Sequence, residues 1–256
     1  MTVFISRLVT YAVLTSSLWF ATMLPDAQAA VNAAVKRKVN LPPSAELAYV
    51  IKARQKGIPV NGEAIMRWTA SGKRFTATNE ARAMLVGKIL DARSEGSVDA
   101  YGLAPDSFTE KRFRKEATIT TFDRSGKMIR FSGSDHTYPI NGGEQERNSA
   151  LWQLISVARA APGRFKPGTV WRFFVAGQRD AEPWAFKVMR QEKIETQLGE
   201  MTTLHISKAP PPDSQEQQLD IWLAPSLEWY PARLRFSDSN GDFVEQTLQQ
   251  VNRLHP

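Results

Sequence analysis

Short runs of alternating apolar and polar residues, separated by glycine, asparagine and proline turns, recur along the chain from residue 45 onwards. A period of two places successive side chains on opposite faces of a β-strand, so each run has one dry and one wet face. Asn240-Gly241 between two such runs is the strongest hairpin signal in the sequence. The pattern predicts a mainly β fold, with about twelve strands in a large curved antiparallel sheet or a partly open barrel. The expected strands cover residues 47–52, 64–68, 75–84, 88–98, 119–122, 128–131, 170–176, 184–194, 202–208, 219–223, 232–237 and 243–251.

One segment has a different period. In residues 144–161, Leu151, Leu154 and Ile155 recur at helical spacing, and Pro162-Gly163 follows the segment. Acidic residues stand near its start and a basic residue near its end, which is the order that complements a helix dipole. The segment therefore predicts a single amphipathic helix that packs its apolar stripe on the sheet.

The first 29 residues have the three parts of a secretory signal peptide. Arg7 precedes an apolar stretch at residues 8–24, Pro25 follows it, and residues 27–29 offer small side chains to a signal peptidase. An uncleaved membrane anchor is the alternative, but hydroxyl residues dilute the stretch, and a spanning helix needs roughly 20 apolar residues. No cysteine follows for lipid attachment. We expect cleavage, release into the periplasm and no segment that spans the membrane.

The rest of the sequence predicts one domain without disulfide bonds. Residues 30–44 are small, basic and proline-terminated, which indicates a linker or an arm, and residues 45–256 form a single β-rich domain. The absence of cysteine excludes disulfides and thiolate chemistry. A net charge of +7 would attract anionic lipid head groups or cell-wall polymers in the periplasm, or it serves solubility alone. Nucleic acid is not an expected partner there.

Three phrases in the second half resemble a known family. They are residues 145–154 (QERNSALWQL), 219–225 (LDIWLAP) and 230–234 (YPARL). They are similar to the bacterial family catalogued as domain of unknown function 3108 (DUF3108), and the resemblance extends over residues 41–251. Glu146 and Asn148 depart from the family pattern, which often has Asp and then Leu or Ile there. The resemblance implies an exported envelope protein and supplies no catalytic residues.

Histidine chemistry has little support in the sequence. The three histidines are His136, His205 and His255, and none has the spacing of a zinc motif. Asp135-His136 lacks a Gly-x-Ser-x-Gly nucleophile elbow, which leaves a hydrolase as a minor alternative. We predict no metal site, no cofactor and no catalytic residue.

Two carboxylates keep a sugar-cleaving enzyme open as another minor alternative. Asp220 and Glu228 flank an aromatic patch that includes Trp222 and Trp229. Glycoside hydrolysis needs two carboxylates that converge in space, which a sequence cannot test. The structural interpretation is that the tryptophans close one edge of the core while Asp220 faces outward.

Basic residues cluster at residues 111–115 (KRFRK). Lysines on an edge strand block aggregation between strands, which is the structural interpretation. The functional interpretation is an anion contact in which Arg112 and Arg114 hold phosphate or carboxylate groups as forks.

Large aromatic residues are concentrated in residues 170–175 and 184–186. A curved sheet under one helix can leave an apolar concavity, which would take an apolar or amphipathic ligand such as a lipid, although an ordinary packed core has the same composition. We therefore expect non-enzymatic binding of such a ligand, or of a protein partner, on the sheet. A structural module in envelope or outer-membrane assembly, which would recognise a protein partner through a strand edge, is the second hypothesis. The expected lining is Trp171, Phe173, Trp184, Phe186, Ile221, Leu234 and Phe236 from the sheet, and Leu151, Leu154 and Ile155 from the helix.

Overall fold

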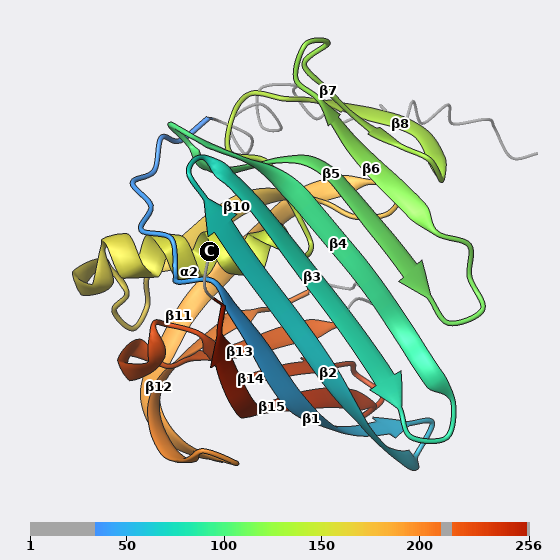
Figure 1. Ribbon diagram of the computed structural model, residues 1–256, viewed down its shortest axis with the longest axis vertical. Helices are drawn as coiled ribbons and strands as arrows, with labels where there is room; N and C mark the ends of the chain where they lie inside the picture. Colours follow the sequence, from blue (N-terminus) through green and yellow to red (C-terminus); the bar gives the residue numbers. More distant parts are fainter. Residues whose placement is uncertain (1–33, 211–216, 255–256) are drawn as a thin grey trace, which may run out of the picture.

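The protein is described by a computed structural model at residues 34–210 and 217–254. The predicted signal peptide, His255 and part of the 209–217 loop lie outside the described residues. Within them, fifteen strands form one sheet in the order β8-β7-β6-β5-β4-β3-β2-β1-β15-β14-β13-β12-β11-β10-β9 (Figure 1). All neighbours are antiparallel except β9 and β10, which run parallel. The predicted fold class, a large curved antiparallel sheet with one helix, is confirmed.

The elements alternate with short turns for most of the chain. The strands are β1 (Ala45–Gln55), β2 (Ile58–Ser71), β3 (Arg74–Ala83), β4 (Gly87–Asp99), β5 (Gly102–Arg112), β6 (Thr118–Asp123), β7 (Met128–Phe131), β8 (Ser134–Pro139), β9 (Gln145–Glu146), β10 (Val170–Ala176), β11 (Ala181–Thr196), β12 (Gly199–Lys208), β13 (Gln218–Leu223), β14 (Pro231–Ser237) and β15 (Phe243–Arg253). The helices are α2 (Ser149–Ala160) and the single turns η1 (Pro162–Arg164) and η2 (Pro225–Leu227).

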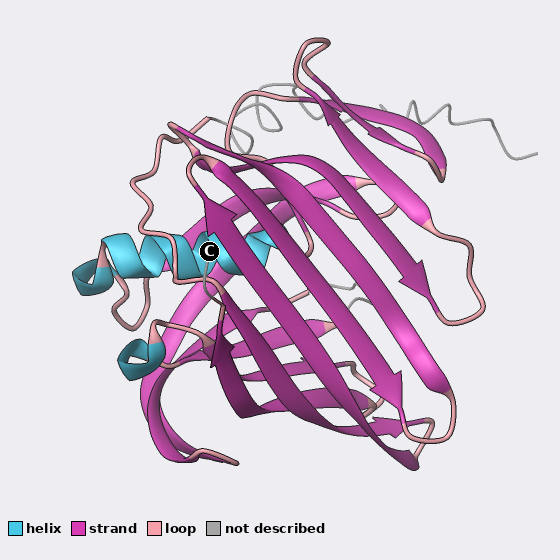
Figure 2. Ribbon diagram, in the orientation of Figure 1, coloured by secondary structure: helices cyan, strands magenta, loops and turns pink. Residues whose placement is uncertain are grey.

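The sheet bends round the helix without closing. Figure 2 shows α2 on the inner side of the curved sheet, with one end of the helix behind the strands that face the viewer. Bulges interrupt the register of several pairs, including β3 with β4 and β11 with β12, and a bulge increases the local twist of its strand. At Gly96, the backbones of β4 and β5 approach each other closely. Any larger residue would fail to fit, because its Cβ would collide with the carbonyl oxygen of Ala104 in β5.

Side-chain contacts join the two ends of the sheet where no strand ladder does. Thr120 in β6 donates from Oγ1 to the carbonyl of Gly177, in the β10–β11 turn, over 2.8 Å. The side-chain amide of Gln178, in the same turn, donates to Oε1 of the buried Glu110 over 2.7 Å. A second apolar cluster packs Phe122 against this turn region. The strands therefore enclose a core.

The helix begins five residues later than the sequence predicted. The predicted segment was 144–161, whereas α2 spans Ser149–Ala160. The carboxylate of Glu146 accepts hydrogen bonds from the backbone N–H groups of Asn148 and Ser149, both 2.7 Å long. An acidic side chain can accept from the free N–H groups at a helix start while its own residue lies before the helix. A periodicity pattern does not distinguish this residue from an acidic residue in the first turn. The prediction of the start was therefore wrong, while that of the helix itself was right.

Three strands were missed for a common reason. The strands β5, β8 and β9 lack a clean alternation of apolar and polar residues, which is the signal that identified the other twelve. The strand β5 contains Pro105 and buries four successive residues at its start, and β8 buries no residue fully. Their pairing depends on neighbouring strands rather than on their own pattern.

Residues 34–44 lie against the body of the protein, although they contain no helix or strand. The indole N–H of Trp68 donates to the carbonyl of Pro42 over 3.0 Å, and the Tyr230 hydroxyl donates to that of Pro43 over 2.7 Å. The backbone N–H of Asn40 donates to the carbonyl of Ser156 in α2 over 3.0 Å. We call these residues the arm. Across the described part of the chain, no helix combines the length and apolar character needed to traverse a bilayer.

Candidate ligand-binding site

The structure gathers all ten predicted lining residues into one apolar cluster. Seven are buried, and the remaining three, Leu151, Trp184 and Phe236, are partly buried and pack against them. The seven buried residues are Leu154, Ile155, Trp171, Phe173, Phe186, Ile221 and Leu234. The alternation of the strands and the helical spacing thus identified faces that meet in space.

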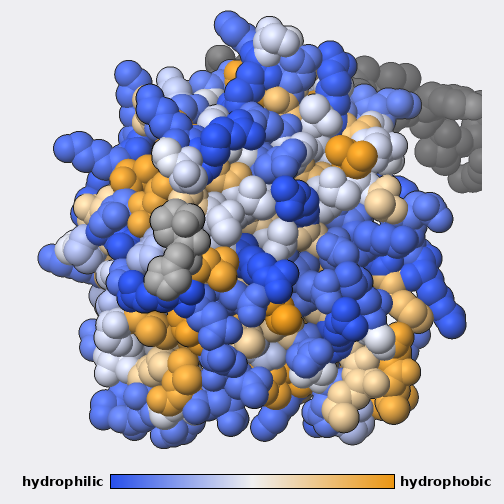
Figure 3. Space-filling model, in the orientation of Figure 1, coloured by the Kyte–Doolittle hydropathy of each residue, from blue (hydrophilic) through white to orange (hydrophobic). Residues whose placement is uncertain are grey.

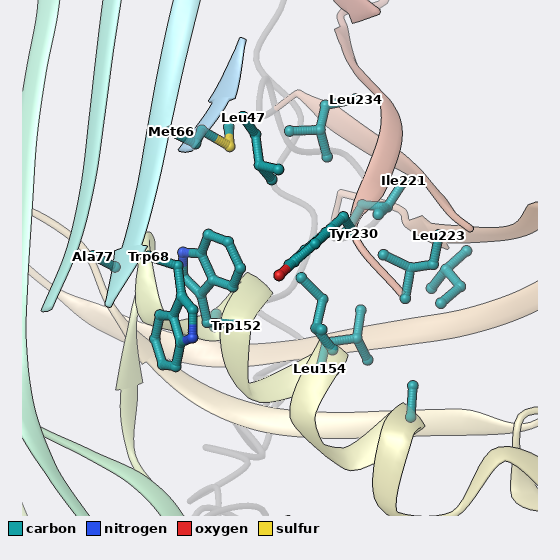
Figure 4. Packing of buried hydrophobic residues seen from close by; sticks show 14 of the residues in the cluster. Leu47, Met66, Trp68, Ala77, Trp152, Leu154, Ile221, Leu223, Tyr230 and Leu234 are labelled. Atoms are coloured by element: carbon teal, nitrogen blue, oxygen red, sulfur yellow. The ribbon is translucent and has the colours of Figure 1, made fainter. Parts of the chain in front are cut away.

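Aromatic rings that the prediction did not include fill the centre of this cluster. Figure 4 shows Trp68, Trp152 and Tyr230 between the helix and the sheet. The rings of Trp68 and Trp152 stack with centroids 4.8 Å apart, and Tyr230 meets Trp152 edge-on at 6.4 Å. All three side chains are fully buried. The centre of the concave side is therefore packed, and space for a ligand lies elsewhere.

An open surface pocket of about 450 Å3, which we call the cavity, lies at the edge of this core. The elements that form it are the arm, η1 and the beginning of β10. It is lined by Arg37, Arg164, Thr169, Val170, Trp171 and Arg172. Of the predicted lining residues, only Trp171 takes part.

The indole ring of Trp171 is surrounded by cations and a second ring. The guanidinium carbon of Arg164 lies 5.1 Å from the ring centroid, and that of Arg37 lies 5.7 Å away. Phe165 stacks on the indole with centroids 4.7 Å apart. Arg37 also lies 5.1 Å from the centroid of Phe173 and donates to the carbonyl of Arg172 over 2.9 Å. Cation–π contacts of this kind hold both side chains beside the cavity.

The positive charge of the cavity is not neutralised by the described residues. No carboxylate among them forms a salt bridge with Arg37, Arg164 or Arg172. Burial lowers the pKa of the Arg37 guanidinium, and repulsion from the positive charge of Arg164 lowers this pKa further. The indole Nε1 of Trp171 is buried and has no hydrogen-bond partner among the described residues. The site thus combines adjacent cations and apolar rings.

Arg112 and Arg114, the predicted anion contacts, lie away from this cavity. Arg112 pairs with the buried carboxylate of Glu110. Arg114 stands in the β5–β6 turn with a φ of 54° and lies 5.0 Å from the ring centroid of Phe113. The contacts of the two arginines therefore differ, and neither residue lines this cavity.

His205 takes part in a polar cluster on the outer face of β11, β12 and β13, where its side chain and that of Asp220 are largely buried. Its Nε2 lies 2.8 Å from Oδ1 of Asp220, and its ring stacks on Trp222 with centroids 4.6 Å apart. Its Nδ1 lies 3.6 Å from Oε1 of Glu192. Although burial acts to raise it, the hydrogen bonds from His205 and Gln218 lower the pKa of Asp220. The two carboxylates bracket the histidine, and neither lines the cavity at β10.

The second carboxylate of the proposed sugar site belongs to other contacts. Glu228 follows η2 in a left-handed conformation, and its side chain is held by Arg159 of α2 and Arg253 of β15. His136 lies exposed in β8. Among residues 34–210 and 217–254, no group of three or more acidic or histidine side chains is arranged to hold a metal ion.

Sequence reasoning missed the three arginines of the cavity. Arg37 stands in the arm, Arg164 in η1 and Arg172 on the polar side of an aromatic strand, so nothing in the local pattern links them. Two features of the sequence could have pointed to these arginines. One is the basic cluster in residues 36–38, and the other is the alternation of Arg172 with Trp171 and Phe173.

Several solved structures are similar to this chain at low sequence identity. A protein with a YmcC-like fold from Bacteroides fragilis is 7% identical, with a TM-score of 0.33, over 86% of this chain and 100% of that one. A DUF1329 family protein from Desulfovibrio piger is 7% identical, with a TM-score of 0.30, over 83% and 86%. The lipoprotein LppX from Mycobacterium tuberculosis is 11% identical, with a TM-score of 0.28, over 82% and 88%.

The sequence itself gives a firmer assignment. No curated protein matches it. The family model described as "Protein of unknown function (DUF3108)" matches residues 48–249, which run from β1 to β15 and include the three phrases noted above. The chain therefore belongs to the DUF3108 family of proteins of unknown function.

Proposed function

We propose that this protein is a non-enzymatic binding protein of the periplasm whose ligand is an amphipathic molecule with an anionic head group. The observation that carries the proposal is the cavity in which Arg37 and Arg164 lie against the ring of Trp171, next to Arg172. No carboxylate among the described residues forms a salt bridge with these arginines. Export rests on the predicted signal peptide at residues 1–29.

The charges of the cavity favour an anion. Guanidinium groups bind phosphate and carboxylate with two parallel hydrogen bonds, and such charge-assisted bonds are about twice as strong as neutral ones. A bound anion would relieve the repulsion between Arg37 and Arg164 that accompanies the lowered pKa of Arg37.

The walls of the cavity favour an apolar portion in the same ligand. Val170 and Trp171 line it, and Val170 is still partly exposed to solvent. Two further rings lie behind these lining residues: Phe165 stacks on Trp171, and Phe173 contacts the guanidinium of Arg37. A volume of about 450 Å3 falls within the usual range of ligand sites and fits a head group with the first part of a chain.

Titration calorimetry with dodecyl phosphate below its micellar concentration tests the proposal. We expect dodecyl phosphate to bind more tightly than inorganic phosphate, and dodecyltrimethylammonium to bind weakly, because the cavity needs both an anion and an apolar chain. Arg164→Gln should weaken binding about tenfold or more, the loss expected for a charge-assisted hydrogen bond. Arg93→Gln, which removes an exposed arginine from β4, is the matched control.

Two results would contradict the proposal. One is equal affinity of the wild type for the cationic and the anionic amphiphile. The other is an Arg164→Gln protein that folds and binds dodecyl phosphate as tightly as the Arg93→Gln control. Native mass spectrometry of protein purified from periplasm would then identify any ligand that co-purifies.

A further inference from the structure

Five large apolar side chains are exposed on three neighbouring turns. They are Ile58 after the β1–β2 turn, Met84, Leu85 and Val86 in the β3–β4 turn, and Phe113 in the β5–β6 turn. Leu85 is 99% exposed, Met84 78% and Ile58 65%. These five make up half of the ten exposed large hydrophobic residues in the described part of the chain. Such a concentration on one surface marks an interaction site.

The topology explains why the three turns are neighbours. The strands β1 to β6 form an antiparallel meander, so every second turn lies at the same end of the sheet. The backbone N–H of Met84 donates to the carbonyl of Asn61 in β2 over 3.0 Å, which ties the second turn to the first. The N–H of Phe113 donates to the carbonyl of Ile89 in β4 over 2.9 Å, which ties the third turn to the second.

The sequence of the three turns is basic as well as apolar. Residues 54–58 (RQKGI), 82–88 (RAMLVGK) and 111–115 (KRFRK) contain eight lysines and arginines and no acidic residue. We call these three segments the turn cluster. Neighbouring carboxylates form salt bridges with Arg82, Lys88 and Arg112. No described carboxylate forms a salt bridge with Arg114 or Lys115, whereas the carboxylate of Asp242 accepts from the backbone N–H of Lys56 over 2.6 Å. Figure 3 shows apolar groups at the lower right of the molecule, where Figure 1 draws the β3–β4 turn, with hydrophilic groups around them.

We propose that the turn cluster docks the protein on an anionic lipid surface. The apolar side chains of Met84, Leu85 and Ile58 would enter the interface between head groups. The cations of Arg114 and Lys115 would contact lipid phosphates. Charge complementarity favours this occupant over a protein partner, because apolar tips interleaved with unpaired cations match the layered polarity of a lipid interface. The docking surface shares no residue with the arginine cavity, so it does not depend on the proposed ligand.

Flotation of the full-length mature protein with lipid vesicles tests the docking. One set of vesicles contains phosphatidylcholine with 30% phosphatidylglycerol, and the other contains phosphatidylcholine alone. We expect the protein to float with the anionic vesicles only, and to be released as the salt concentration rises. The double variant Met84→Ser/Leu85→Ser should lose most of the binding, and Arg114→Gln/Lys115→Gln should weaken it several-fold.

Two control variants distinguish docking through the turn cluster from non-specific hydrophobic adsorption and from ligand binding in the cavity. Leu198→Ser removes an exposed apolar residue from the β11–β12 turn at the other end of the sheet, and should float like the wild type. Arg164→Gln should also float normally, because it changes the cavity alone. Binding that survives Met84→Ser/Leu85→Ser, or that is lost in Arg164→Gln instead, would overturn the proposal. So would a wild type that ignores anionic vesicles but self-associates through Leu85 in sedimentation velocity, since the turn cluster would then be an interface between copies.

Discussion

Trp68 of β2 and Trp152 of α2 stack in the middle of the molecule, with ring centroids 4.8 Å apart and an angle of 20° between their planes. Phe75 extends the stack on Trp68 at 5.5 Å. This column of rings fastens the helix to the inner face of the sheet. It also explains why the centre of the concave side is packed while the cavity lies at its edge.

Truncation of Trp152 should therefore weaken the whole domain. We expect Trp152→Ala to lower the free energy of unfolding by about 3–5 kcal/mol, as for other buried tryptophans. Trp152→Phe should cost less, because it keeps a ring in the stack and removes an indole N–H that has no partner among the described residues. Urea denaturation followed by circular dichroism measures both. A loss below about 1 kcal/mol in Trp152→Ala would show that the stack does not hold the helix.

Glu146 should give the protein an unusual dependence on pH. Burial raises the pKa of this carboxyl above its ordinary value of 4.5, against the hydrogen bonds that it accepts from Ser94, Ser149 and the backbone. Above pH 4.5 the unfolded chain has released the proton while the folded protein still holds it. The contribution of Glu146 to the free energy of unfolding therefore falls as the pH rises from 4.5 through the raised pKa.

Glu146→Gln removes this titration. We expect the free energy of unfolding of the wild type to decrease relative to that of Glu146→Gln as the pH is raised from 4.5 towards 7, in urea titrations at several pH values. The variant has its own constant cost, because an amide cannot accept from both Asn148 and Ser149 as the carboxylate does. Parallel curves for the two proteins would mean that Glu146 titrates normally in the folded state.

Glu228 should show the opposite dependence. Its hydrogen bond with Arg159 keeps the pKa of Glu228 below the ordinary value of 4.5, and Arg159 also donates to the Glu228 carbonyl over 3.1 Å. We expect Glu228→Gln to cost about 1–2 kcal/mol at pH 7. The difference from the wild type should disappear as the pH falls through the lowered pKa, because the wild-type carboxyl is then neutral too. Urea denaturation at pH 7 and near pH 3 distinguishes this from a cost that is independent of pH.

The arm should contribute to stability through Tyr230. Its buried hydroxyl donates to the carbonyl of Pro43 over 2.7 Å, and Tyr230→Phe leaves that carbonyl without this donor. We expect a loss of about 1–2 kcal/mol and faster cleavage of residues 34–44 in limited proteolysis. Tyr138→Phe, on the partly buried Tyr138 of β8, is the matched control and should change neither measurement. Equal cleavage of the two variants would show that the arm is held by other contacts.

Much of the fold was accessible from local pattern. Alternation in residues such as Leu219 and Ile221, and helical spacing of Leu154 and Ile155, assigned the correct apolar faces because each depends only on the geometry of one element. The start of the helix was not accessible in this way. The Glu146 side chain caps α2 from outside, and its position is known only once the neighbouring backbone is placed.

The amino-acid sequence by itself determined the class of fold, the single helix, the family and the set of apolar faces that form the core, because strand and helix periods are local properties. Only the tertiary structure decided that Arg37 and Arg164 meet at Trp171 next to Arg172, and that the tips of three hairpins form one surface. Both results depend on the bend of the sheet and on the register between strands. Residues more than a hundred positions apart, such as Arg37 and Arg172, become neighbours only when that curvature is fixed.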